Sequence, residues 1–403
     1  MNLLILSHRV PFPPNKGEKI RTYHQIEYLK AIGHQVQVIC PLEGANDQLY
    51  CEQLSEKLDV TCTGIKIGNR KLKMLAGLIK GKALSVANFY DSSLQQKIDE
   101  YLARETVDTI ICTASSMAEY IFNSSSVNTQ TNLVMDFMDL DSDKWRQYAQ
   151  RSAFPKSWVY QREQKLLAAY ELKIAAKFNS CLFISDAEVE LFCKNLADNS
   201  QVHAIANGID TSLFKVNLER DYSSAPRLLF TGVMDYLPNV DAVVWFVESV
   251  WPQVIEKYPE AQFYIAGMNP NEKVKALDKK QGIVVTGFVE DIMPYYDLAT
   301  LFIAPFRIAR GVQNKVLQAM ACGLPVVTTN SGGEGIDYTD SGNLIIANTE
   351  DEIFEKIQYC IENPAQSREI GLNAAELIQQ GYSWTGKLKM LGKLIESNSK
   401  VNS

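Results

Sequence analysis

Short apolar runs alternate with longer segments of helical hydrophobic period along the chain. This alternation is typical of parallel sheets whose strands are connected by helices, and several runs are apolar throughout, as strands buried on both faces are. In the first half the predicted strands are Leu3–Leu6, Gln35–Cys40, Val60–Ile67, Thr109–Cys112, Leu133–Phe137 and Cys181–Ile184. In the second half they are Arg227–Thr231, Gln262–Ala266, Ile283–Thr286, Leu301–Ala304, Pro325–Thr328 and Leu344–Ile346. The pattern predicts an α/β protein with two doubly wound units.

The two series of strands predict two Rossmann-like domains. We expect an N-terminal domain over 1–205, a linker over 206–226 and a C-terminal domain over 227–380. Val202–Pro226, which contains N-G-I-D and R-D-Y-S-S-A-P, is interpreted as a hinge. Residues 381–403 are expected to form a helix that packs back toward the N-terminal domain. Parallel sheets bind ligands beyond the carboxyl ends of their strands, so two facing domains predict a cleft.

Composition and charge exclude several classes of protein. The chain has 403 residues, 46% of them hydrophobic and 22% charged, and its net charge of −7 argues against a nucleic-acid binder. Eight cysteines without a C-x-x-C pair and four histidines without ligand spacing predict no metal, no cofactor and reduced thiols. The opening M-N-L-L-I-L-S-H is too short an apolar run for a signal peptide. We expect a cytoplasmic protein, soluble or at the inner face of the plasma membrane.

The most informative segment is Ala304–Asn330, which indicates a phosphate site. A helix is predicted to begin near Asn314 and to end before Gly323, which tolerates a left-handed backbone. Lys315 in the first turn and Arg310 before it add positive charge to the free N–H groups of the helix N-terminus. Such cations oppose the helix dipole unless an anion lies between them. A solvated basic loop is the alternative.

The loop after the first strand does not fit a dinucleotide site. It reads S-H-R-V-P-F-P-P-N-K-G-E-K-I-R and lacks the G-x-G-x-x-G turn of NAD-binding domains. The loop ends at Gly17, where a backbone without a side chain is able to approach a phosphate, before a helix that is predicted to start near Glu18. A tight strand-to-helix turn without function is the alternative.

Six short motifs are spread over nearly the whole chain. They are Gly17 after the first strand, G-H-x-V-x-V-I at Gly33–Ile39, N-G-I-D-x-x-x-F at Asn207–Phe214, F-T-G at Phe230–Gly232, T-G-F-V-E-D at Thr286–Asp291 and A-M-A-C-G-L-P-V-V at Ala319–Val327. Their order and spacing resemble the retaining GT-B glycosyltransferases of the family 4-like group. A closer resemblance, to the exosortase/PEP-CTERM-associated sugar transferases, lies in P-P-N-K-G-E-K-I-R-T-Y-H, D-F-M-D-L-D-S-D-K-W-R-Q-Y-A and R-G-V-Q-N-K.

This resemblance implies two Rossmann-like domains, a nucleotide-diphosphate-sugar donor held mainly by the second, and a glycan or lipid-linked acceptor approaching from the first. The residues implied for the donor are Gly17, Gly232, Phe288, Val289, Asn314, Lys315, Gln318, Gly333 and Glu334. Those implied for the acceptor side are Lys16, Ser115, Asp139 and Asp141. Lys315 and Arg310 are the expected catalytic residues.

The chain also departs from the family. Two glutamates are usual where it has Arg310 and Gln318, and Gln318 keeps an acceptor oxygen for a ribose but not the charge. The basic residues that often follow the first strand of the second domain are missing from G-V-M-D-Y-L-P-N. Neutralisation of the diphosphate is therefore expected to fall on Lys315 and Arg310. Asn239 in the same segment, where the donor phosphates are expected, is interpreted as a helix cap, with a contact to the donor as the alternative.

The expected chemistry needs no metal. Cleavage of a sugar–diphosphate bond releases an anion, which Lys315, Arg310 and a helix N-terminus are able to stabilise. Asp139, Asp141 and Asp143 form an alternating acidic run after a strand; we interpret the first two as acceptor-side residues, with a cation site or a helix cap at Asp141 or Ser142 as alternatives. Retention of anomeric configuration is implied by the resemblance alone.

Other segments carry weaker signals. Asn330–Ile336 is rich in glycine and offers Glu334 as a hydroxyl acceptor, or is a plain turn. Arg70–Lys82 combines helically spaced leucines with five basic residues, which indicates either contact with anionic lipid or an ordinary surface helix. The five tryptophans are expected in the core or between domains, with a place in the acceptor cleft as an alternative for Trp145.

The residues, together with what the resemblance implies, predict a hexosyltransferase-type, retaining and metal-independent glycosyltransferase of exopolysaccharide or cell-surface polysaccharide biosynthesis. A nucleotide-sugar epimerase of the same architecture and a non-catalytic glycan- or nucleotide-binding scaffold remain open. The absence of the two glutamates leaves the scaffold as an alternative function. A requirement for an acceptor would exclude the epimerase.

Overall fold

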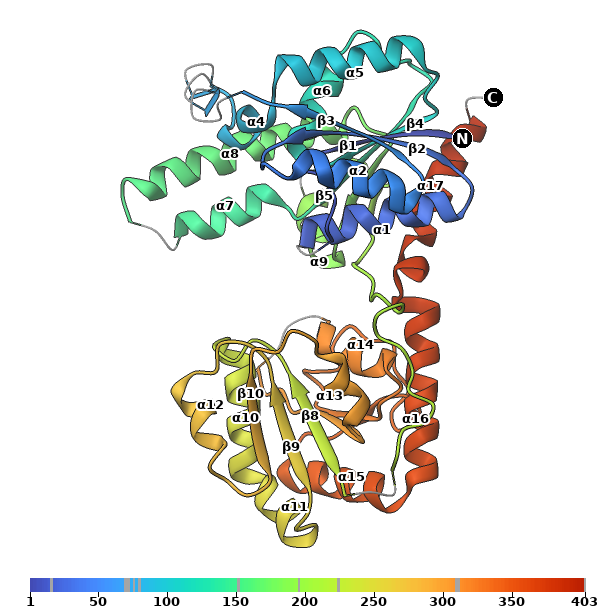
Figure 1. Cartoon of the computed structure of the whole chain (residues 1–403). Coiled ribbons are helices and arrows are strands. Elements are labelled where there is room, and N and C mark those ends of the chain that lie inside the picture. Colours follow the sequence, from blue (N-terminus) through green and yellow to red (C-terminus); the bar gives the residue numbers. More distant parts are fainter. Residues whose placement is uncertain are drawn as a thin grey trace. The chain divides into compact units, whose positions relative to one another are not determined.

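The chain forms two compact units in the computed structural model. Unit 1 comprises Met1–Asn207 and Lys387–Ser403, and unit 2 comprises Gly208–Gly386 (Figure 1). The structure describes residues 1–14, 17–68, 73–74, 77–78, 81–150, 153–194, 196–222, 225–308 and 312–401. Within this part, no helix has both the length and the apolar character needed to cross a bilayer.

Unit 1 is built on a parallel sheet of seven strands in the order β3-β2-β1-β4-β5-β6-β7. Its strands are β1 (Asn2–Ser7), β2 (Gln35–Leu42), β3 (Thr61–Lys66), β4 (Thr109–Thr113), β5 (Asn132–Met138), β6 (Ser180–Phe183) and β7 (Val202–Ala204). The predicted strands of the first half are confirmed. The seventh was missed: Val202–Ala204, which the sequence placed in a hinge, pairs with β6.

Helices cover both faces of this sheet. They are α1 (Gly17–Ala31), α2 (Asp47–Leu58), α4 (Leu84–Phe89), α5 (Ser92–Arg104), α6 (Ala118–Phe122), α7 (Asp141–Gln150), α8 (Lys156–Ala175) and α9 (Asp186–Cys193). The helices α1 and α2 lie on one face and α5 and α6 on the other (Figure 1). This follows from the strand order. From β1 to β3 the chain moves toward one edge of the sheet, and from β4 to β7 it moves toward the other edge. Because the connections between parallel strands are right-handed, the two directions place their helices on opposite faces.

A buried ion pair fixes α1 to the sheet. The Nε and Nη2 atoms of Arg21 donate to the two carboxylate oxygens of Asp136 on β5, at 2.7 and 3.2 Å. The Nη1 atom donates to the carbonyl of Ile205 at 2.7 Å and to Asn207 Oδ1 at 3.1 Å. Removal of either charged partner would leave the other charge buried and unpaired. The start of the expected hinge is therefore packed in unit 1.

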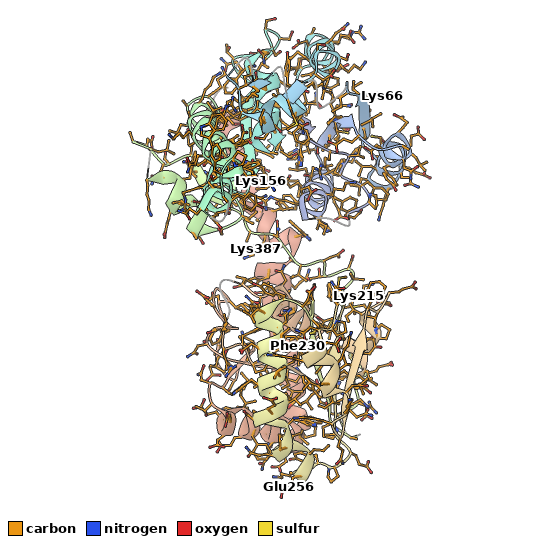
Figure 2. All side chains as sticks on the ribbon, turned by 90° about the vertical axis from the view of Figure 1, so that its left-hand side faces the viewer. Lys66, Lys156, Lys215, Phe230, Glu256 and Lys387 are labelled. Carbon is orange, nitrogen blue, oxygen red and sulfur yellow. The ribbon has the colours of Figure 1, made fainter. Side chains whose placement is uncertain are left out.

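Unit 2 has a parallel sheet of six strands in the order β10-β9-β8-β11-β12-β13. Its strands are β8 (Arg227–Thr231), β9 (Gln262–Ala266), β10 (Ile283–Gly287), β11 (Leu301–Ala304), β12 (Val326–Thr328) and β13 (Ile345–Ile346), all of which the sequence predicted. Its helices are α10 (Leu237–Ser249), α11 (Trp251–Lys257), α12 (Glu272–Leu277), α13 (Met293–Leu298), α14 (Asn314–Ala321), α15 (Glu350–Glu362) and α16 (Pro364–Leu377). The core combines aliphatic and aromatic side chains, and Phe230 lies in its interior (Figure 2).

The segment that follows β7 is also packed against unit 2, through Arg220 near its end. Arg220, buried in unit 2, donates from Nη1 to the carbonyl of Tyr296 at 2.7 Å and from Nη2 to that of Cys322 at 2.9 Å. The last helix, α17 (Trp384–Val401), contributes Lys387 onward to unit 1, where a Cβ on Gly392 would lie 2.9 Å from the hydroxyl of Tyr28. Trp158 is 58% exposed, so the core is wrong for it as one of the two expected places, the core or between domains.

Candidate functional site

A pocket of about 760 Å³ lies in unit 2 at the carboxyl ends of β8, β9 and β10. Between β8 and its neighbour β11 the order of the strands reverses, and parallel sheets bind ligands at such switch points. Six residues that the sequence assigned to the donor line this pocket: Gly232, Phe288, Val289, Asn314, Lys315 and Gln318.

The N-terminus of α14 forms one wall of the pocket. The helix begins at Asn314 and ends at Ala321, with Gly323 at φ +69°, so both predicted ends are confirmed. Gln313 precedes the helix and makes no side-chain hydrogen bond to its first turn. The first N–H groups are therefore not capped by that side chain, and they carry the positive end of the helix dipole into the pocket.

Lys315 holds its ammonium group among uncharged partners. Its Nζ donates to Oδ1 of Asn239 at 2.5 Å and lies 5.2 and 5.0 Å from the ring centroids of Phe230 and Phe306. Burial lowers the pKa of Lys315 to about 8, because the charged form loses water. Such an ammonium gains more from an anionic ligand than a lysine that already has a carboxylate partner does.

Asn239 lines the pocket beside Lys315, where the sequence reading favoured a helix cap over a contact to the donor. Its expected role as a helix cap is wrong, since Tyr236 is the N-cap residue of α10 and Asn239 lies inside the helix. Its amide nitrogen donates to the carbonyl of Val233 at 2.9 Å, which leaves the oxygen directed at Lys315. The signal in the sequence was its place three residues into a helix that follows β8, where a ligand-facing side chain is expected as readily as a cap.

Two glycines give this wall its shape. A Cβ on Gly232 would lie 2.7 Å from the Asn239 amide nitrogen and 3.1 Å from Lys315 Nζ, so the side chains of Lys315 and Asn239 occupy that space. Gly267, after β9, has φ +147°, and a Cβ there would lie 1.7 Å from the carbonyl oxygen of Gly232. The backbones after β8 and β9 therefore approach each other as only glycine allows.

The side-chain oxygen of Gln318 already accepts one hydrogen bond inside the protein. The Tyr296 hydroxyl donates to its Oε1 at 3.3 Å and is itself 2.9 Å from the hydroxyl of Thr231. The oxygen that the sequence reading reserved for a ribose is thus already used inside the protein, although a carbonyl oxygen accepts a second bond. Tyr296 is a further pocket residue that the sequence did not reveal. Its ring packs edge-to-face against that of Phe214, with 5.7 Å between the ring centroids.

Phe288 forms an exposed aromatic edge of the pocket. It is 67% exposed and follows Gly287, whose φ of +68° turns the chain after β10. A flat ring at the mouth of a pocket is suited to stacking on a nucleobase. Asp235, in contrast, places a carboxylate in the lining, where it opposes a bound phosphate.

The remaining donor-side predictions lie elsewhere. Arg310 falls outside the described residues. Gly333 and Glu334 are not part of the pocket lining. A Cβ on the neighbouring Gly335 would lie 2.8 Å from a methyl of Val312, so this loop borders the segment before α14. Gly17 begins α1 in unit 1 and is likewise not among the residues that line the pocket of unit 2.

A second cavity, of about 470 Å³, lies in unit 1 at the switch point between β1 and β4. It brings together three of the four predicted acceptor-side residues, Ser115, Asp139 and Asp141, and Trp145 also lines it; the fourth, Lys16, lies outside the described residues. Ser115 donates to Asp141 at 3.1 Å, and burial raises the pKa of Asp141.

The backbone around this second cavity is strained. Ala114 after β4 and Met138 at the end of β5 both line it and have φ of +73° and +65°. Residues other than glycine adopt such angles at a cost of about 1–3 kcal/mol, and they cluster at binding and catalytic sites. No pattern in the sequence signalled either residue.

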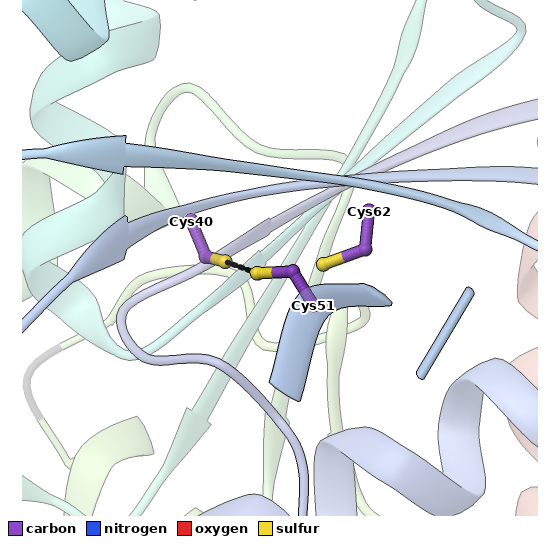
Figure 3. A group of neighbouring side chains, drawn as sticks. All are labelled: Cys40, Cys51 and Cys62. Atoms are coloured by element: carbon purple, nitrogen blue, oxygen red, sulfur yellow. Dashed lines mark hydrogen bonds between the residues drawn. The ribbon is translucent and has the colours of Figure 1, made fainter. Parts of the chain in front are cut away.

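Three cysteines converge in unit 1, which the sequence reading did not foresee. Their sulfurs all lie within 4.8 Å of one another, and those of Cys40 and Cys51 are 3.9 Å apart (Figure 3). The sequence reading found no metal-ligand spacing because it looked for short intervals, whereas these residues come from β2, α2 and β3. Cys40, Cys51 and Cys62 form the one candidate metal-binding group in the described part of the chain.

Comparison with known proteins finds a family match within unit 2. Residues 225–363 match the family model of glycosyl transferases group 1. An uncharacterized 44.6 kDa protein in the cps region of Klebsiella pneumoniae is 25% identical over 398 residues, 94% of this chain and 96% of that protein. A GDP-mannose-dependent monoacylated alpha-(1-6)-phosphatidylinositol monomannoside mannosyltransferase of Corynebacterium glutamicum is 23% identical over 248 residues, 57% of this chain and 65% of that protein.

A solved structure shows the fold. The crystal structure of Anabaena HepE in complex with UDP aligns with 98% of this chain and 100% of that chain, with a TM-score of 0.64 and 16% sequence identity. The predicted fold class is confirmed: the two doubly wound parallel sheets are those of a GT-B protein.

Proposed function

We propose, for a GT-B chain whose residues 225–363 match the glycosyl transferases group 1, that unit 2 binds a nucleotide-diphosphate sugar and transfers the sugar to a glycan or lipid-linked acceptor. Lys315 at the N-terminus of α14, inside the pocket at the ends of β8–β10, carries this proposal. The product is a cell-surface or exopolysaccharide, for which the relative in a cps region is supporting evidence.

The positive charge in the pocket serves the departing diphosphate. When the bond between sugar and diphosphate breaks, negative charge grows on the phosphate, and an ammonium with a helix N-terminus stabilises it more than it stabilises the bound donor. Lys315 has no carboxylate partner among the described residues, so its field is available to the ligand. Arg310, four residues before Asn314, is proposed to add a second charge.

The rest of the pocket suits the remainder of the donor. Phe288 offers its exposed face to the base, and Val289 lies beside it in the lining. UDP in HepE and GDP-mannose in the name of the mannosyltransferase support a nucleoside diphosphate as the common element. Retention of configuration and independence of metal belong to the same proposal. Gly17, Gly333 and Glu334 remain proposed contacts to the donor that the pocket lining does not include.

The cavity of unit 1 is proposed to receive the acceptor. Asp139 and Asp141 provide carboxyl groups, and Ser115 and Lys144 provide donors, all in one lining. Hydroxyl groups of a sugar acceptor pair with both kinds of side chain. Lys16 keeps its proposed acceptor-side role. The protein is proposed to work in the cytoplasm, at the inner face of the plasma membrane when the acceptor is lipid-linked.

Calorimetric titration of the full chain with UDP, GDP, uridine and guanosine tests donor binding. One diphosphate should bind at least tenfold more tightly than its nucleoside, because the phosphates meet Lys315 and α14. The matching radiolabelled nucleotide sugar is then incubated with and without a lipid or glycan extract. Label should move only when the extract is present. Isomerisation of the donor without acceptor would indicate an epimerase, and binding without any turnover would indicate a scaffold.

A further inference from the structure

The helical hairpin of α7 and α8 carries large aromatic side chains at its tip. Phe154, in the connecting loop, is 82% exposed, Trp158 in the first turn of α8 is 58% exposed and Tyr148 in the last turn of α7 is 44% exposed. Figure 1 shows α7 and α8 extending away from the sheet of unit 1. Exposed Trp and Phe together at the end of a projecting element are not needed for its packing.

The hairpin is held rigid behind this tip. The ring of Trp145 lies 5.8 Å from that of Tyr148 on the same helix and 5.2 Å from that of Tyr160 on α8. The ring centroids of Tyr148 and Tyr160 are 6.1 Å apart. These contacts join the two helices, so the exposed aromatic groups lie on a preformed support.

The charge of the hairpin differs from that of the whole protein. Over 141–150 and 153–175 the described residues include six basic side chains (Lys144, Arg146, Lys156, Arg162, Lys165 and Lys173) and four acidic ones (Asp141, Asp143, Glu163 and Glu171), a net +2 against −7 for the chain. Glu163 is buried, and it pairs with Arg162 at 2.8 Å. Lys156 and Lys165 are exposed, and Lys156 is marked in Figure 2.

We propose that the tip of the α7–α8 hairpin inserts into an anionic lipid surface. Tryptophan and phenylalanine partition to the boundary between headgroups and acyl chains, and lysines pair with anionic headgroups, so the two properties of the tip fit one partner. The helix α7 continues from the tip to the unit 1 cavity, which Lys144, Trp145 and Tyr148 line. Resting here on the proposed function, we infer that the acceptor is lipid-linked and reaches this cavity along α7.

The hairpin is better placed for this contact than the basic segment Arg70–Lys82. Two lysines of that segment are described, and both are paired: Lys73 with Asp91 at 2.5 Å, and Lys82 with Glu119. Lys73 is also only 17% exposed. Its remaining basic residues, Arg70, Lys71 and Lys80, fall outside the described residues.

Sedimentation of the full chain with vesicles tests the proposal. Vesicles of phosphatidylcholine with about a third phosphatidylglycerol should bind the protein in low salt, and pure phosphatidylcholine should bind it much less. The double variant Phe154→Ser, Trp158→Ser should bind at least tenfold less. Lys156→Gln with Lys165→Gln should lose roughly fivefold per lysine. Leu218→Ser, which removes a 66% exposed apolar side chain from unit 2, is the matched control.

Two further measurements separate this proposal from others. Brominated lipids should quench tryptophan fluorescence in the parent but not in Trp158→Phe. Nucleoside diphosphate binding should be unchanged in the hairpin variants, so loss of vesicle binding does not depend on the donor site. Vesicle binding that survives the double variant, or that is lost only when Lys71, Lys73, Lys80 and Lys82 become Gln, would overturn the hairpin as the membrane contact.

A different observation carries a second inference, at the three converging cysteines. Cys62 on β3 lies beside Val38 in the register of the sheet, and Cys40 follows two residues later on the same strand as Val38, so both side chains project from one face. Cys51 reaches them from α2 (Figure 3). A Cβ on Gly64, the register partner of Cys40, would lie 2.3 Å from a methyl of Leu42 and 3.1 Å from the Cys51 sulfur, so the glycine leaves room for both side chains.

The spacing of the sulfurs fits three thiolates around one ion. Sulfurs about 2.3 Å from a common centre in a plane are about 4 Å apart, and Cys40 and Cys51 are 3.9 Å apart. The described residues place no histidine or carboxylate in the group, which is lined by Val10, Phe12, Leu42 and Tyr50. Structural zinc requires a fourth ligand, whereas Cu(I) is a soft ion that thiolates bind.

We propose that Cys40, Cys51 and Cys62 bind one Cu(I) ion. Each thiol releases its proton to the solvent as its sulfur binds the ion, and no electron is transferred. Anaerobic titration with Cu(I) against a chelating competitor should show one ion per chain and the ultraviolet charge-transfer band of copper thiolate. Serine at Cys40, Cys51 or Cys62 should abolish the band, and Cys193→Ser should not.

The parent protein provides a test that does not depend on folded variants. Cu(I) should protect Cys62 from alkylation while Cys193 remains as reactive as before, with the modified peptides identified by mass spectrometry. Equal protection of both cysteines, or a disulfide between Cys40 and Cys51 in place of bound copper, would overturn the proposed site.

Discussion

Lys315 donates a hydrogen bond to Asn239 across 76 positions of sequence, and this contact joins the start of α14 to the first turn of α10. Both side chains reach the place that a side chain on Gly232 would fill. The amide partner orients the ammonium without neutralising it. The charge of the lysine is therefore kept for a ligand.

We expect Lys315→Ala to abolish transfer and to weaken binding of nucleoside diphosphate roughly 10- to 100-fold, the equivalent of a charge-assisted contact of about 1.5–3 kcal/mol. Binding of the nucleoside should change little, because the lysine faces the phosphates. Calorimetry on both ligands measures the difference. Lys279→Ala, an exposed lysine of unit 2, is the matched control. Equal affinities for parent and Lys315→Ala would contradict the phosphate site.

Binding of the diphosphate should depend on pH through the same group. Burial lowers the pKa of Lys315 to about 8, so the free protein loses this charge as the pH rises through 8. The dissociation constant of the diphosphate should then be about tenfold larger at pH 9 than at pH 7. Lys315→Arg, which stays charged, should remove most of that dependence. A flat profile for the parent would mean that the lysine carries its charge over the whole range.

The sequence predicted the elements better than the site, and the reason is physical. Strands that are buried on both faces consist of apolar runs, so the sequence predicted every strand of the two sheets except β7. The three residues of β7, V-H-A, do not form such a run. The ends of α14 were predicted because Gly323 is a local signal. The contact of Lys315 with Asn239, the convergence of Cys40, Cys51 and Cys62, and the strain at Ala114 arise only when distant segments meet.

Gly267→Ala should destabilise unit 2 by at least about 2 kcal/mol. The new Cβ would lie 1.7 Å from the Gly232 carbonyl oxygen, and φ of +147° is unfavourable for alanine. Gly381→Ala is the control, because a Cβ there has no neighbour within 4 Å. Urea denaturation should show a lower midpoint for Gly267→Ala and a nearly unchanged one for Gly381→Ala. A stable Gly267→Ala would show that the two backbones are able to separate without cost.

Glu171 should make the hairpin helices less stable as the pH rises. Burial raises the pKa of Glu171 to about 7 from an ordinary value of 4.5. The folded protein therefore holds a proton that the unfolded chain has lost between about pH 4.5 and 7, and stability falls across this window, by up to roughly 3 kcal/mol. Glu171→Gln keeps an acceptor for the Ser142 N–H and removes the charge.

Denaturation midpoints at pH 5 and pH 8 check this expectation. Glu171→Gln should match the parent at pH 5 and exceed it at pH 8. The control is Glu190→Gln, an exposed carboxylate on α9, which should follow the parent at both values. A parent protein that is equally stable at pH 5 and pH 8, with no gain from Glu171→Gln, would show that the carboxyl is ionised at no cost.

Transfer should survive chelation of divalent ions. A metal in such reactions neutralises the departing diphosphate, and in this chain Lys315 and the N-terminus of α14 supply positive charge at the pocket where the diphosphate is proposed to bind. Activity with excess EDTA should therefore stay within about twofold of the untreated rate. Loss of activity that Mg²⁺ or Mn²⁺ restores would instead assign a cation to the acidic run, and Asp139→Asn and Asp143→Asn would show which carboxylate holds it.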